Sequence, residues 1–71
     1  MSMAKIIRTL LIERDMTMTE MAEKLGTSVQ NISGKLHRDN FSEKELQDIA
    51  KVCNATFSGS FILNDTGKEI K

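Results

Sequence analysis

The chain has 71 residues, ten of them basic and ten acidic, with one histidine, one cysteine and no net charge. A chain of this length forms one domain with a marginal hydrophobic core, so stabilisation by a partner chain is plausible. A lone cysteine excludes a disulfide framework and a thiolate metal site, and no apolar run is long enough for a signal peptide or a membrane span. We expect a soluble, cytoplasmic protein in which Cys53 is a reduced, buried thiol.

The first predicted element is a helix over residues 3–14. Apolar residues recur there at i, i+3, i+4, i+7 and i+8, which is the spacing of an amphipathic helix. They are Met3, Ile6, Ile7, Leu10 and Leu11. A break is expected at Asp15–Met16.

Residues 17–37 predict two short helices separated by a tight turn. Thr17 and Glu20 form a capping box, so a helix begins at Met18, and Gly26 ends it because glycine readily takes the left-handed conformation. Ser28 caps the next helix, from Val29 to about residue 37. The apolar positions predicted to face inward are Met21, Ala22 and Leu25, then Val29, Ile32 and Leu36. This arrangement is a helix-turn-helix.

The remaining residues predict a fourth helix and a β-hairpin. Ser42 and Glu45 form a second capping box, and the helix that follows turns Leu46, Ile49, Ala50 and Cys53 inward and ends near Asn54. From Thr56 to Leu63 the residues Phe57, Gly59, Phe61 and Leu63 alternate as in a strand, and 64–67 and 68–71 suit a turn and a return strand. The hairpin must pack on the helices, pair with a second copy, or do both.

The exposed side of the third helix is the candidate functional surface. From Thr27 to Arg38 there is no acidic residue, so this segment can present a positive surface although the chain is neutral. Gln and Asn side chains can each present a donor and an acceptor to an adenine edge, and Lys or Arg can reach guanine or phosphate. The polar residues concerned are Ser28, Gln30, Asn31, Ser33 and Lys35.

Residues 6–54 resemble the lambda-repressor/Cro-like helix-turn-helix domain, also called the XRE family. The pattern is T-x-x-E-L-A-x-x-L-G-x-S-x-x-x-I, carried here by Thr17, Glu20, Met21-Ala22, Leu25-Gly26, Ser28 and Ile32. Later residues similar to the family's fourth helix are Leu46, Ile49, Ala50 and Val52. The resemblance implies a mainly α, four-helix repressor-like fold over residues 1–54. Residues 55–71 would be a short C-terminal β-hairpin for dimerisation or core packing, similar to the tail of some short repressor-like proteins.

The function implied by the resemblance is sequence-specific binding of double-stranded DNA, usually as a homodimer, in transcriptional regulation. The family's base-contacting positions correspond to Ser28, Val29, Gln30, Asn31 and Gly34. We expect phosphate contacts from Thr17, Met18, Thr19, Lys35, His37 and Arg38, the last three of which could instead be solvated surface residues.

The chain departs from the family pattern at Met18 and at Lys35-Leu36, the latter in place of an Ile-Glu pair that often closes the family's third helix. Many members have glutamine where this chain has Met18, which lies off the predicted inward stripe and could contact a DNA sugar or a thymine methyl group. Gly34 costs a helix about 1 kcal/mol relative to alanine. It either allows close approach to the duplex or is simply tolerated.

The main alternative is a protein-interaction module, such as an antirepressor or a partner subunit, on a helix-turn-helix fold that has lost DNA binding. The zero net charge and Met18 favour this alternative, whereas the acid-free third helix favours DNA. No catalytic motif or metal-ligand cluster is evident, so we expect no enzymatic activity, cofactor, metal, small-molecule ligand or membrane partner.

Overall fold

Four helices are followed by three short strands in the computed structural model, which describes residues 2–70. The helices are α1 (Met3–Glu13), α2 (Met18–Leu25), α3 (Val29–Arg38) and α4 (Glu43–Val52). The strands are β1 (Ala55–Phe57), β2 (Phe61–Leu63) and β3 (Glu69–Ile70). The predicted mainly α fold with a C-terminal β element is therefore confirmed.

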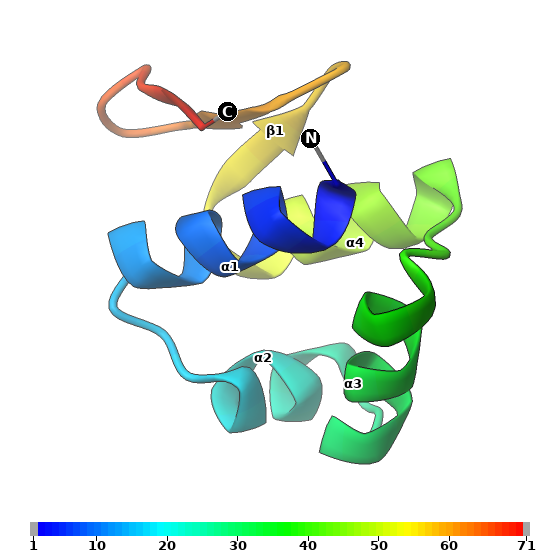
Figure 1. The fold of residues 1–71 in the computed structure, drawn as a ribbon. Coiled ribbons are helices and arrows are strands. Elements are labelled where there is room, and N and C mark those ends of the chain that lie inside the picture. Colours follow the sequence, from blue (N-terminus) through cyan, green and yellow to red (C-terminus); the bar gives the residue numbers. More distant parts are fainter. Residues whose placement is uncertain (1, 71) are drawn as a thin grey trace.

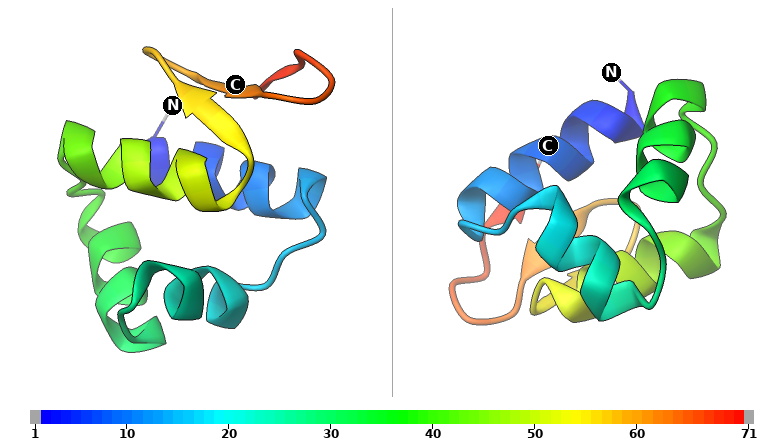
Figure 2. Two further views of the ribbon diagram at one scale, coloured as in Figure 1. Left: turned by 180° about the vertical axis from the view of Figure 1, so that it is seen from behind. Right: turned by 90° about the horizontal axis from the view of Figure 1, so that it is seen from below.

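These elements lie in three layers (Figure 1). In this view helices α1 and α4 lie at the same level in the middle, the sheet lies above them, and α2 and α3 lie below them. The view from behind in Figure 2 shows the same order. The helix-turn-helix therefore faces away from the C-terminal sheet.

The predicted capping residues begin and end the helices as expected. At the start of α2, Thr17 Oγ1 accepts from the amide of Glu20 at 3.1 Å, and Glu20 Oε1 accepts from the amide of Thr17 at 3.0 Å. A second reciprocal pair joins Ser42 and Glu45 at the start of α4. Gly26 has φ 73° and ψ 31°, a left-handed conformation that ends α2 without steric cost.

One hydrophobic core joins all three layers. Its fully buried side chains come from α1, α2, α4 and the sheet, and include Ile7, Leu10, Met21, Ile49, Phe61 and Ile70. Cys53 is also buried, and the loss of solvation raises the pKa of its thiol. The predicted buried thiol is therefore confirmed.

The prediction of one continuous strand from Thr56 to Leu63 is wrong, because the chain turns back at residues 58–60. Gly59 has φ 77° in that turn and does not lie on a strand face. Strand β2 pairs antiparallel with β1 and then with β3, so the expected hairpin is a three-stranded sheet in the order β1-β2-β3. Phe57 and Phe61 are paired across the first turn, with ring centroids 5.0 Å apart.

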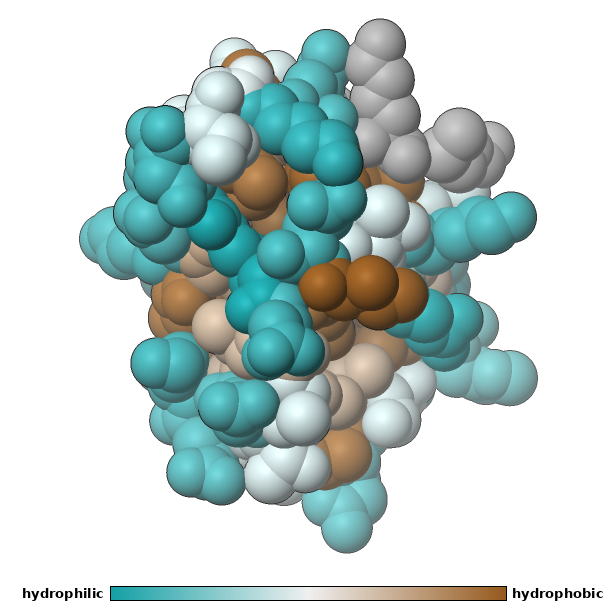
Figure 3. All heavy atoms as spheres, turned by 90° about the vertical axis from the view of Figure 1, so that its left-hand side faces the viewer, coloured by the Kyte–Doolittle hydropathy of each residue, from teal (hydrophilic) through white to brown (hydrophobic). Residues whose placement is uncertain are grey.

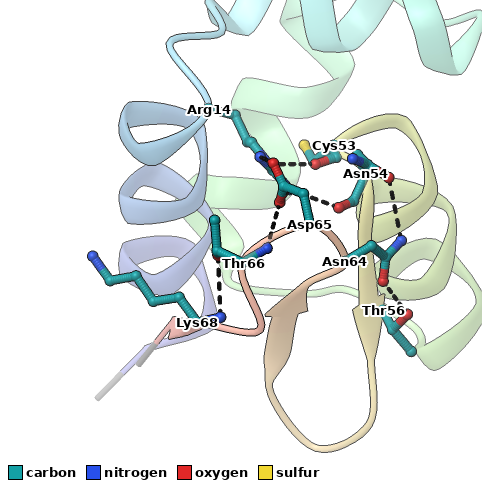
Figure 4. Close-up of polar contacts among 8 residues, drawn as sticks. All are labelled: Arg14, Cys53, Asn54, Thr56, Asn64, Asp65, Thr66 and Lys68. Carbon is teal, nitrogen blue, oxygen red and sulfur yellow. Dashed lines mark hydrogen bonds and ion pairs between the residues drawn. The ribbon is translucent and has the colours of Figure 1, made fainter.

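Arg14 connects the sheet to the helices (Figure 4). Its Nε donates to the carbonyl oxygen of Cys53 at 2.8 Å, and its Nη2 donates to that of Asn54 at 2.8 Å. The two terminal nitrogens also donate to the two carboxylate oxygens of Asp65, at 3.0 and 2.7 Å. These hydrogen bonds lower the pKa of Asp65 to about 2. One guanidinium therefore joins the ends of α1 and α4 to the turn after β2; we call this group the Arg14 clasp.

Candidate nucleic-acid interface

Helix α3 has one face buried in the core and an opposite face that points outward. Ile32 and Leu36 are each 4% exposed and anchor α3 to the core. Gln30, Gly34 and Arg38 are spaced four residues apart and therefore follow one line along the helix surface. The side chains of Gln30 and Arg38 are exposed, and neither makes a hydrogen bond or ion pair within the part of the chain that the structure describes.

Gly34 and Arg38 are neighbours on this line. A Cβ atom added to Gly34 would lie 3.5 Å from Arg38 Nη1, which is ordinary van der Waals contact. The guanidinium therefore lies beside the backbone of Gly34, which carries no side chain.

Ser28 and Asn31 are partly committed to the turn before α3. Ser28 Oγ accepts from the amide of Asn31 at 3.2 Å, which caps the helix. The side-chain Nδ2 of Asn31 donates to Thr27 Oγ1 at 3.1 Å. The amide oxygen of Asn31 and one of its N–H groups stay available to a ligand. Thr27 was not among the predicted site residues; it precedes the cap residue Ser28, so it lies outside the helix and the four-residue spacing rule does not predict this contact.

The prediction that Met18 lies off the inward-facing side is wrong. Met18 is half-buried and packs against the core, because the first turn of α2 lies close enough for its flexible side chain to fold inward. Val29 is likewise half-buried and in contact with the core, as its place on the inward stripe predicted. Thr17 and Thr19 are exposed at the start of α2, where helix amides lack intrahelical partners.

Lys35 is not a free cation. Its Nζ lies 2.5 Å from Glu45 Oε2 on α4, and about one third of each side chain is exposed. The hydrogen bond from Lys35, followed by one from the Ser42 amide, lowers the pKa of Glu45 to about 2, so its carboxylate is ionised at neutral pH. The expected acid-free surface is therefore flanked by an acid from another helix. His37 and Arg38 are exposed, and neither forms an ion pair within residues 2–70.

The surface beside the start of α2 is mostly hydrophilic (Figure 3). Hydrophobic side chains are interspersed there among polar ones. Among the described residues, Ile12 is the one large hydrophobic side chain that is exposed, at 79%.

The family model for a Cro/C1-type helix-turn-helix DNA-binding domain matches residues 6–57. The chain belongs to this family. Its type is a DNA-binding domain rather than a class of enzyme, which agrees with the helix-turn-helix described above. No curated protein and no solved structure matched the chain in the corresponding comparisons. None of the helices in the described part of this Cro/C1-type domain has the length and apolar character needed to cross a membrane.

Proposed function

We propose that this Cro/C1-type domain is a sequence-specific, repressor-like transcriptional regulator that places α3 in the major groove of double-stranded DNA. The observation that carries the proposal is the outward line of α3, where Gln30 and Arg38 are exposed and unpaired on either side of Gly34. A side-chain amide with a free donor and a free acceptor can pair with both hydrogen-bonding groups of an adenine edge.

The base-contacting set in this proposal occupies the first turns of α3. Gln30 reads a base directly, and Asn31 contributes the amide oxygen that Thr27 leaves free. Ser28 and Val29 lie at the start of the helix, where Val29 can offer a methyl group to thymine. Gly34 lets the backbone come close to the duplex.

The phosphate-contacting set lies at the two ends of the helix-turn-helix. Arg38 and His37 supply exposed basic groups at the end of α3, and Lys35 is a further contact once it is released from Glu45. At the start of α2, the amides of Met18 and Thr19 have no intrahelical partner and suit a phosphate oxygen, whereas Thr17, whose amide donates to Glu20, would offer its exposed side-chain hydroxyl.

We further propose that the protein binds as a two-fold dimer. The longest dimension of one molecule is 30 Å, and successive major grooves on one face of B-DNA lie roughly 34 Å apart. One copy presents one α3, so two copies on a near-palindromic site would engage two grooves. The segment 55–71 is the candidate dimerisation element, because the sheet lies on the side away from α2 and α3.

An amide-resolved NMR titration with mixed-sequence duplex DNA tests this proposal. At low salt we expect shifts at residues 17–19 and 28–38 that fade as salt is raised, since phosphate contacts release counterions. Selection of a preferred duplex from a random pool and sedimentation of the complex then test sequence specificity and dimerisation. Absent shifts, or shifts confined to residues 55–71, would contradict DNA binding.

The second candidate is the protein-interaction module. It is favoured by the zero net charge and by the neutralisation of Lys35 through Glu45. An NMR titration in which duplex DNA changes no amide signal, while a protein ligand shifts the amide signals of the sheet, would support this second candidate.

A further inference from the structure

The pair formed by Lys35 and Glu45 joins the proposed DNA-reading helix to a helix that has no proposed DNA contact. Lys35 follows Ile32 by three residues, so it lies on the flank of α3 that faces α4. Together with Asn31 and Phe41 the pair lines a groove of about 190 Å³ between α2, α3 and α4.

Glu45 is held in place from its own helix. Its Oε1 accepts from the amide of Ser42 at 2.9 Å, in the capping box that begins α4. Its Oε2 faces Lys35 Nζ. The carboxylate therefore cannot follow Lys35 toward DNA without breaking the cap, whereas the lysine side chain can rotate away.

We propose that Glu45 restrains Lys35 in the free protein and thereby lowers the affinity of the domain for DNA. This inference rests on the proposed function. A DNA phosphate competes with the Glu45 carboxylate for the Lys35 ammonium, and an ionised carboxylate beside the phosphate backbone adds repulsion. Glu45 is thus a positioning residue that acts on DNA through Lys35.

The test compares duplex affinity and its salt dependence in Glu45→Gln and Glu43→Gln. Glutamine can still accept from the Ser42 amide, so Glu45→Gln keeps the cap and removes only the charge. Glu43 is exposed in the same first turn and makes no ion pair within residues 2–70, so its variant changes the net charge equally. We expect Glu45→Gln to bind duplex severalfold more tightly than Glu43→Gln, with a salt slope steeper by about 0.9 for one added phosphate contact.

Lys35→Gln supplies a second measurement, so the test does not rest on the folding of Glu45→Gln alone. In the wild-type background we expect it to lower affinity less than Arg38→Gln does, because Glu45 already restrains the lysine. In the Glu45→Gln background the two losses should become similar. Equal affinity and salt slope in Glu45→Gln and Glu43→Gln, with wild-type binding intact, would overturn this inference alone. A wild-type protein that binds no duplex at low salt would overturn the proposed function together with it.

Discussion

Arg14 and Arg38 show how one residue type serves two regions of this molecule differently. The Arg14 side chain is 16% exposed and donates to two carbonyl oxygens and a carboxylate, so its hydrogen-bonding capacity is used within the fold. The Arg38 side chain is exposed on α3 and makes no ion pair in the part of the chain that is described. The sheet side of the molecule is therefore held together by internal hydrogen bonds, whereas the outward side of α3 has polar groups available to a ligand.

The strongest test of the sheet side is Phe61→Ala. Phe61 is fully buried, and truncation of such a phenylalanine costs about 3–5 kcal/mol, most of the stability expected of so small a domain. We expect urea titrations followed by circular dichroism to show that the variant is already largely unfolded before urea is added. Phe57→Ala is the matched control: Phe57 is half-buried, so its truncation should cost less stability. Equal losses in the two variants would show that the sheet is not anchored through Phe61.

The next comparison exchanges each arginine for lysine. Lysine keeps the charge but cannot make the forked contact with a carboxylate and two carbonyl oxygens. We expect Arg14→Lys to lower the melting temperature measurably, and Arg38→Lys to leave it unchanged. A stable Arg14→Lys protein would mean that the Arg14 clasp adds little to the fold.

On the α3 side, Gln30→Ala should change DNA recognition and not stability. Loss of one bidentate base contact costs about 1–3 kcal/mol of discrimination and relaxes one base position. Arg38→Ala should instead weaken all duplexes alike and reduce the salt slope by about 1. Competition binding with single-base variants of a selected site distinguishes the two. If Gln30→Ala weakened every duplex equally, Gln30 would not read a base.

The Arg14 clasp also predicts a pH dependence on the sheet side. The pKa of Asp65 is lowered from 3.8 to about 2 in the folded protein, chiefly by the hydrogen bonds from Arg14. The stabilisation of the fold by the ionised Asp65 carboxylate is therefore fully present above pH 3.8 and is lost as the pH falls toward about 2. We expect urea titrations to show a shallower loss of stability across this range in Asp65→Asn than in the wild type. An identical pH profile in both proteins would contradict the assigned role of Asp65.

The sequence predicted what depends on neighbouring residues and missed what depends on contacts between elements. The capping boxes at Thr17 and Ser42 act within one turn, so the helix starts could be predicted closely. Around Gly59 the alternation of apolar residues suggested one strand, because a strand and a tight hairpin share that pattern over so short a span. The pairing of Lys35 with Glu45 joins separate helices, and no local pattern indicates it. At the candidate site the exposed outer line of α3 was expected, but the inward packing of Met18 was not.

Gly34→Ala has the smallest expected effect, and it should change both the stability of the fold and the affinity for DNA. Alanine favours a helix interior by about 1 kcal/mol over glycine, and the three heavy atoms nearest to the new methyl group outside the local helix backbone would all belong to the flexible Arg38 side chain, so stability should rise. On DNA the same methyl group would raise the outer surface of α3 between Gln30 and Arg38, so affinity should fall. Ser33→Ala is the control, since it removes a hydroxyl from an exposed position of the same helix and adds no bulk. A stabilised Gly34→Ala protein with unchanged affinity would mean that α3 does not approach the duplex along the line of Gln30, Gly34 and Arg38.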